Sequence, residues 1–278
     1  MEDRLTHPIF DSVRPWLDRI GGSPSLDLLN GLSEERDLRN ESGKPIRFVP
    51  PSASDPYYEV HLFETGQVQT RPENWHDLFN ALVWLAFPKT KARINAMHAA
   101  EIPRESGRRG RLRDLLTIFD EGGAIVAGGE AVAALVREAR WRELFVERHR
   151  EFRIVVVGHA VLEQALAPYL GLTCKVIFAD PARDLDAQGA DWLATRGRTP
   201  RDLPPLPVLG YPGWFPGAGE PGFYSDERHF RPPQRTTAKM RSSNALMRSC
   251  KMPAGVGRAA AVSQGAEESP GSTEQDAG

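Results

Sequence analysis

The chain has 278 residues, a formal net charge of −2, 40% hydrophobic residues and 26% charged residues. These values are typical of a globular protein that buries a sizeable core, and they exclude a global field that attracts nucleic acid or anionic lipid. Two cysteines exclude a disulfide framework and a cysteine-rich zinc site, and no apolar run reaches signal or membrane length, so we expect a cytoplasmic protein.

The first part of the chain predicts two short helical regions and one hairpin. Residues 1–50 are expected to form an N-terminal arm with short helical pieces, one of them starting at 33–36. Residues 57–70 are rich in β-forming side chains, which predicts a β-hairpin around 64–66. Apolar residues at helical spacing predict a helix over 74–87. Since proline suits a first helical turn, Pro88 predicts a second helix over 89–100.

The middle of the chain mixes both kinds of element. After a basic loop at 104–113, two apolar runs flank residues 120–123 and predict a second hairpin. Helices are expected near 129–139, 141–149, 158–170 and 184–195, and strands over 152–157 and 172–178. These elements lack the regular alternation of a doubly wound sheet. The predicted fold class is therefore α+β, a mixed, helix-rich single domain with short β-hairpins and a small sheet.

Composition changes after residue 200. Prolines interrupt any regular element over 200–233, but aromatic residues such as Trp214, Phe223 and Tyr224 are interleaved with them. Such a segment is expected to wrap over the domain surface. From residue 234 the chain is rich in Ser, Ala, Gly and Arg and buries too little apolar surface to offset ordering entropy. We predict one domain over 1–233 and a disordered basic tail over 234–278.

The densest polar cluster lies in the two predicted helices around Pro88. His76 and Asn80 are four residues apart and share one helix face. In the next helix, Lys91, Asn95 and His98 form another stripe. If the two helices pack as a hairpin, the stripes face each other across a cleft, where the side chains can bind a metal or act as acid and base. Helix capping is the alternative for Asp77, which follows the N-cap candidate Asn74, and the helix dipole is the alternative for His98.

Two further clusters are candidates. His159 and Glu163 lie one turn apart where a buried strand leads into a helix, a common ligand position, although an ordinary helical ion pair explains them too. Asp120 and Glu121 can hold Mg²⁺, but acids before Gly122-Gly123 are also ordinary turn chemistry, which we favour. The arginines of the 104–113 loop can contact phosphates, although a solvated loop is the simpler interpretation.

Several residues of these clusters belong to stretches that resemble a known family. The stretch 70–84, with Asn74-Trp75-His76-Asp77 at its centre, and the following Phe87-Pro88-Lys89-Thr90-Lys91 are similar to a bacterial family called domain of unknown function 3025. Residues 95–98 belong to the same resemblance. Segments 116–121, 158–160 and 206–214, and Phe223-Tyr224 with Phe230-Arg231-Pro232, look like later blocks of it. The resemblance covers roughly residues 8–233. It implies one bacterial domain that ends near Pro233, and it implies no activity.

The leading hypothesis is a metal-assisted hydrolase acting on a phosphoester or nucleic-acid substrate, with a divalent metal ion as cofactor. The proposed catalytic groups are His76, Asp77 and His159. The proposed metal ligands are His76, Asp77, His159, Glu163 and Asp120. The proposed substrate-binding residues are Asn80, Lys91, Asn95, His98, Arg111 and Arg113.

Two alternatives remain open. One is a non-catalytic binding or scaffold protein that uses the proline- and aromatic-rich segment as its partner surface. The other is a nucleic-acid binder that uses the arginine loop and the basic tail.

Overall fold

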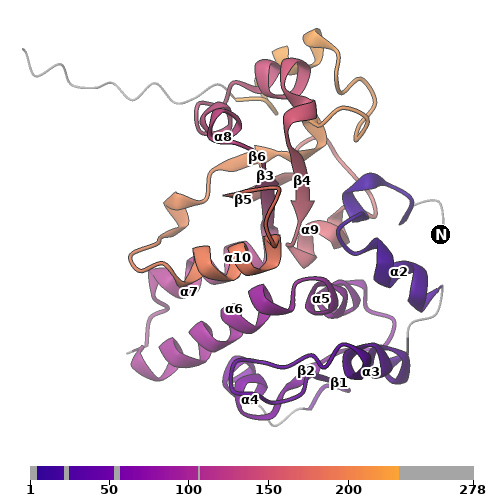
Figure 1. Cartoon of the computed structure of the whole chain (residues 1–278), viewed down its shortest axis with the longest axis vertical. Helices are drawn as coiled ribbons and strands as arrows, with labels where there is room; N and C mark the ends of the chain where they lie inside the picture. The colour runs from indigo at the N-terminus through magenta and orange to yellow at the C-terminus, as the bar shows by residue number, and fades with distance from the viewer. Residues whose placement is uncertain (1–4, 22–24, 53–56, 106, 232–278) are drawn as a thin grey trace, which may run out of the picture. The chain divides into compact units, whose positions relative to one another are not determined.

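The computed structural model describes residues 5–21, 25–52, 57–105 and 107–231. Figure 1 shows a mixture of helices and strands in which a small curled sheet is accompanied by a second, smaller one. The predicted α+β class is confirmed. The predicted tail over 234–278 lies outside the described residues. None of the helices in the described ranges is long and apolar enough to cross a membrane.

The short helical pieces expected near the N-terminus are present. They are the 3₁₀ turn η1 (Pro8–Phe10) and the helices α2 (Arg14–Ile20) and α3 (Leu26–Glu35). Ile9, Phe10 and Val13 are at most 1% exposed, so this segment contributes directly to the core. The predicted helix start at 33–36 is wrong, because α3 begins after the N-cap Ser25 and ends at Glu35.

The predicted hairpin over 57–70 is also wrong. Residues Tyr58–Thr65 form helix α4, and only Gln67–Gln69 form a strand, β2, which pairs in parallel with β1 (Arg47–Val49). Gly66 ends α4 in the left-handed region, with φ 79°, and a Cβ there would lie 2.1 Å from the carbonyl oxygen of Pro45. The β-forming side chains of 57–63 are overruled by this packing, because strand propensity is weak and depends on context.

The two helices predicted around Pro88 are confirmed. Helix α5 spans Trp75–Ala86 and α6 spans Pro88–Glu101, with the proline in the first turn of α6. The side chain of Asn74 caps α5 by accepting a hydrogen bond from the backbone N–H of Asp77 at 3.0 Å. Such a cap satisfies one of the backbone donors left free at a helix start.

The second predicted hairpin is half wrong. Residues Arg111–Gly122 form helix α7, and strand β3 (Gly123–Ala127) follows without a turn between two strands. Leu115, Leu116 and Phe119 are fully buried. Their i, i+1 and i+4 spacing is helical, and this periodicity outweighs the turn signal of the two glycines.

The four-stranded sheet has the order β4-β3-β5-β6. Strand β3 runs antiparallel to β4 (Arg153–Val156) and parallel to β5 (Thr173–Ala179), and β5 pairs antiparallel with β6 (Pro205–Pro207). Helix α9 (His159–Gln164) follows β4. The remaining α-helices of the described residues are α8 (Glu130–Arg137) and α10 (Leu185–Ala194), and Glu143–Glu147 form a π-helical turn. Short 3₁₀ turns are formed by Ile102–Arg104, His149–Glu151, Pro200–Asp202, Val208–Gly210 and Pro221–Ser225. The helix expected over 158–170 is therefore shorter than predicted.

The proline- and aromatic-rich segment packs onto the domain, as its composition predicts. Trp214, Tyr224 and Phe230 are at most 8% exposed, and the hydroxyl of Tyr224 donates to the carbonyl oxygen of Gly210 at 2.7 Å. In the described part of the chain, the large hydrophobic side chains that remain exposed are Tyr57 and Tyr169. Tyr211, Phe215 and Phe223 are partly buried against the same core.

Candidate functional site

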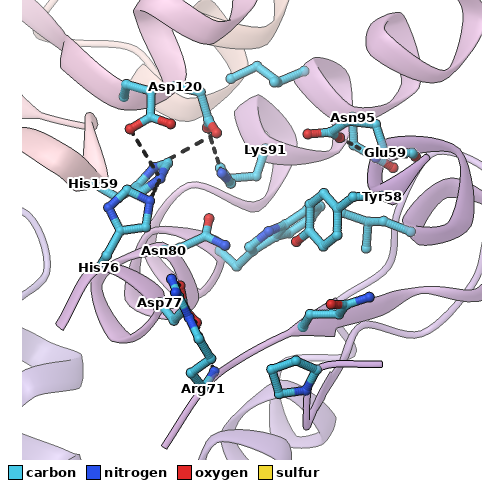
Figure 2. Close-up of a pocket in the computed structure, with 16 residues that line it drawn as sticks. Tyr58, Glu59, Arg71, His76, Asp77, Asn80, Lys91, Asn95, Asp120 and His159 are labelled. Atoms are coloured by element: carbon cyan, nitrogen blue, oxygen red, sulfur yellow. Dashed lines mark hydrogen bonds and ion pairs between the residues drawn. The ribbon is translucent and has the colours of Figure 1, made fainter. Parts of the chain in front are cut away.

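A pocket of about 480 Å³ is lined by residues of α5 and of the helices α4, α6, α7 and α9. Figure 2 shows the two histidines, His76 and His159, at one end, Asn80 and Tyr58 further along, and Asn95 with Glu59 beyond them. The volume is in the range of small-molecule sites. Its polar lining comes from α4, α5, α6, α7 and α9, with Gln69 of β2 and Arg71, so segments far apart in the sequence build one cavity.

The two histidines meet because α5 packs against α9. The Nε2 atoms of His76 and His159 lie 3.1 Å apart, and the rings meet edge to face with their centroids 4.5 Å apart. His159 is only 4% exposed. The predicted proximity of these two residues, on which a shared metal site depends, is therefore present.

Gly158 lets His159 approach the end of α7. A Cβ at Gly158 would lie 2.5 Å from the backbone nitrogen of Gly123 and 2.6 Å from the carbonyl oxygen of Glu121. Only a residue without a Cβ fits this contact. The backbone N–H of Gly158 donates to the carbonyl oxygen of Gly123 at 2.7 Å, which ties the start of α9 to the junction of α7 and β3.

Three carboxylates surround the two imidazoles. Glu163 Oε2 lies 2.9 Å from His76 Nδ1, and Asp120 Oδ2 lies 3.8 Å from His159 Nδ1. Glu121 Oε2 lies 3.7 Å from His159 Nε2. One ring nitrogen of each histidine and one carboxylate oxygen of Glu121 lie within 4.8 Å of one another. The Nδ1 atom of each histidine thus faces one carboxylate. The two Nε2 atoms lie next to each other, and the Glu121 carboxylate lies beside them.

Burial controls the charges at this end of the pocket. It lowers the pKa of His159 to about 4, although Asp120 opposes the shift, so the imidazole is neutral near pH 7. Burial and repulsion from Asp120 raise the pKa of Glu121. Burial also opposes ionisation of Asp120, but the ammonium of Lys91, 2.5 Å away, outweighs it and keeps the pKa of Asp120 below its usual range.

The position of Asp120 and Glu121 is costly for a purely structural pair. Both lie in the last turn of α7, where the helix dipole disfavours negative charge, and this turn contains no basic residue. They are not the turn residues that the sequence favoured. Two carboxylates at the C-terminal end of a helix need neighbouring cations. Lys91 forms an ion pair with Asp120 but not with Glu121.

Asp77, predicted to be a ligand and a catalytic group, is paired elsewhere. Its two carboxylate oxygens accept hydrogen bonds from the Arg71 side chain at 2.7 and 2.9 Å and from the Arg71 backbone at 2.8 Å. Burial opposes ionisation, but these hydrogen bonds outweigh it, so the pKa of Asp77 lies below its usual range. Asp77 lines the pocket, but it is not among the groups gathered at the histidines.

Three predicted substrate-binding residues do not line the pocket. His98 is 3% exposed, accepts a hydrogen bond from Arg113 Nε at 3.2 Å, and has its pKa lowered to about 4 by burial. It is neutral near pH 7, so it does not offset the helix dipole as a cation. Arg113 is bound to Glu105 at 2.6 Å, and Arg111 is exposed. The arginine loop therefore does not serve this cavity.

The other predicted stripe residues do line it. Asn80 lies one turn after His76 on α5, and Asn95 lies one turn after Lys91 on α6. The expectation that the two stripes face a common cleft holds for these four residues. The sequence missed Tyr58, Glu59 and Arg71, because the first two were assigned to a hairpin, and it left Glu121 out of the ligand set.

The comparisons with known proteins give a family and no activity. A family model described as "Protein of unknown function (DUF3025)" matches residues 46–235. No curated protein and no solved structure matches the chain. The match includes every pocket-lining residue and ends close to the boundary that the sequence predicted near residue 233. Because the match covers well over half of the sequence, the chain belongs to the DUF3025 family.

Proposed function

We propose that the chain is a metal-assisted hydrolase in which His76, His159 and Glu121 bind one divalent ion. The observation that carries this proposal is the convergence of two imidazole Nε2 atoms, 3.1 Å apart, beside a carboxylate. Two nitrogens bound to one zinc ion at about 2.0–2.1 Å lie about 3.3 Å apart in a tetrahedral site. The spacing of the histidines is therefore close to that of two ligands of one ion.

The protonation of the imidazoles supports the same interpretation. Glu163 accepts at Nδ1 of His76, which places the proton on Nδ1 and leaves the Nε2 lone pair free. The two Nε2 atoms are at hydrogen-bonding distance, so without an ion a proton on His159 Nε2 can be donated to His76 Nε2. A divalent cation would take the place of that proton once His159 carries its proton on Nδ1, an atom that has no hydrogen-bond partner among the described residues and lies 3.8 Å from Asp120 Oδ2. Carboxylate–histidine–metal arrangements of this kind are common in metal sites.

The donor set fits hydrolytic chemistry. Two histidines and one glutamate bind catalytic zinc and leave a fourth position for water, and such an ion lowers the pKa of that water to about 7 and polarises a bound carbonyl or phosphoryl oxygen. Lys91, whose side chain is 5% exposed, would hold Asp120 in place beside His159. Glu163 would keep the His76 ring oriented.

The phosphoester preference loses its support. Arg111 and Arg113 do not line the pocket, and the two cations that do, Lys91 and Arg71, are each bound to a carboxylate. We therefore propose metal-assisted hydrolysis without assigning it to phosphoesters. The aromatic side chains on which the alternative partner surface depends are buried or partly buried against the core. The tail on which a nucleic-acid binder depends lies outside the described residues.

The test is the metal content of the purified protein. The protein is stripped with a chelator, reloaded separately with Zn²⁺, Mn²⁺, Fe²⁺ and Ni²⁺, dialysed and measured by inductively coupled plasma mass spectrometry. We expect about one ion per chain, lost in a His76→Ala/His159→Ala variant and reduced in Glu121→Gln. His149→Ala, which removes a histidine outside the pocket, is the control and should bind like the parent.

Hydrolysis is measured on the same samples with chromogenic carboxylic esters, anilides and phosphate esters. The reaction should disappear with the metal, return on reloading and stay absent in the double-histidine variant. A parent protein that binds none of the four ions would refute the metal centre. Hydrolysis that survives removal of the metal would point instead to a proton relay through the paired histidines.

A further inference from the structure

The wall of the pocket beyond the histidines carries two buried acceptors without partners. Among the described residues, the Oδ1 atoms of Asn80 and Asn95 have no hydrogen-bond donor. Asn95 is 2% exposed. Its orientation is fixed, because its Nδ2 donates both to the carbonyl oxygen and to the carboxylate of Glu59, each at 2.8 Å. Leaving a buried acceptor unsatisfied is unfavourable, so each such atom needs an explanation.

Helix geometry sets where these acceptors lie. Asn80 follows His76 by four residues on α5, and Asn95 follows Lys91 by four residues on α6. Four residues advance a helix by about 6 Å. Lys91 is bound to Asp120, which lies beside His159. Helix α5 thus has His76 at the histidine end of the pocket and α6 has Lys91 there, and each helix has an asparagine one turn further on. Figure 2 shows Asn80 between the histidines and Tyr58.

The same wall is unsuited to an anion. Its cations Lys91 and Arg71 are bound to Asp120 and Asp77. The side chain of Asn95 donates to a carboxyl group, that of Glu59, at 2.8 Å, and burial raises the pKa of this carboxyl. Leu62, Trp84 and Ile94 add apolar surface to the lining. Acceptors beside apolar side chains match a flat group with hydrogen-bond donors at its edge.

We propose that Asn80 and Asn95 bind a planar group with two or more N–H donors, of the carboxamide, amidine or amino-heterocycle class. This group would lie about one helical turn, or roughly 6 Å, from the bond that is cleaved. The position of the cleaved bond rests on the proposed metal centre, whereas the donor site itself depends only on the two asparagines. A substrate that lacks such donors leaves both amide oxygens unpaired, which disfavours its binding.

Three probes of nearly the same shape test the donor requirement. Benzamidine and benzamide carry N–H donors on a flat ring, and benzoate presents only acceptors. Binding is measured by saturation-transfer NMR and titration at up to about 10 mM, because fragments of this size bind in the millimolar range. The protein is first stripped with a chelator, so that benzoate cannot bind through a metal. We expect the two donor probes to bind and benzoate to bind at least about fivefold more weakly.

Variants of Asn80 identify the site. Asn80→Leu keeps the volume and removes the acceptor, and we expect it to weaken benzamidine binding about fivefold or more. Asn80→Asp keeps an acceptor in the same place and should retain or strengthen that binding. Melting temperatures of both variants check that the fold is intact.

Three outcomes would overturn the donor site: equal binding of benzoate and benzamidine, no binding by either donor probe, or unchanged affinity in a folded Asn80→Leu protein. Because the chelated protein is used throughout, a failed metal experiment would refute the proposed hydrolase and leave this result valid. A failed probe experiment would refute the donor site and leave the metal centre untouched.

Discussion

Replacing Gly158 by alanine tests how the fold brings His159 to the end of α7. The new Cβ would lie 2.5 Å from the Gly123 nitrogen, 2.6 Å from the Glu121 oxygen and 2.7 Å from the Gly122 Cα, whereas ordinary contacts begin near 3.4 Å. All three atoms belong to the backbone, so no side chain can rotate away. The two segments must separate by about 0.7–0.9 Å, the difference between these distances.

Overpacking of this kind costs about 1–3 kcal/mol in the free energy of unfolding. For a domain of about 150–250 residues, each kcal/mol lowers the melting temperature by about 2–4 °C, so Gly158→Ala should lower it by about 2–12 °C. The separation also moves His159 away from Glu121. If these residues hold an ion, the affinity for Zn²⁺ should fall about tenfold or more, as it does when the support of a metal ligand is disturbed.

Gly129→Ala is the matched control. Gly129 is also the N-cap of a helix, its φ is −75°, and an added Cβ would meet no atom within 4 Å. Its stability should stay within about 1 kcal/mol of the parent. Thermal unfolding followed by circular dichroism compares the two variants. If Gly158→Ala melts at the same temperature as Gly129→Ala, the close approach of α9 to the α7–β3 junction is refuted.

Two further predictions concern residues that the sequence assigned to the site. Asp77→Asn replaces an acceptor of three hydrogen bonds from Arg71 by an amide. It should lower the free energy of unfolding, measured in urea, by about 1–3 kcal/mol and leave the metal content unchanged. Loss of the metal from a stably folded variant would return Asp77 to the ligand set. Burial lowers the pKa of His98 from 6.5 to about 4. As the pH is lowered, the unfolded chain therefore takes up a proton before the folded protein does. The free energy of unfolding should fall between pH 6.5 and pH 4, by at most about 3 kcal/mol. His98→Gln should remove that part of the acid-induced loss and His149→Gln should keep it; identical pH profiles for the parent and His98→Gln would contradict the assignment.

The sequence determined the elements whose pattern is local and strong. Helices α5 and α6 follow from apolar periodicity and from the proline between them, because helical spacing is a property of residues three and four apart. The same spacing places His76 with Asn80 and Lys91 with Asn95 on common helix faces. The strand that ends before Gly158 was also visible, as was the packing of the aromatic segment after residue 200.

Weak or competing local signals gave the errors. Residues 57–63 favour a strand by side-chain type, yet they form α4, because strand propensity is overruled by packing. At 111–122 the glycines suggested a turn and hid a helical period. Glu59 belongs to the first of these misassigned segments, and for that reason the sequence did not place it in the pocket.

Only the tertiary structure decided which polar groups meet. His76 and His159 are 83 residues apart, and Glu163 is 87 residues from His76. Their contacts depend on the packing of α5 against α9. That packing depends on Gly158, a position where the backbone of the α7–β3 junction leaves no space for a side chain. Asp77, next to His76 in the sequence, turns instead to Arg71. Adjacent residues on a helix point in different directions, so proximity along the chain does not fix partnership in space.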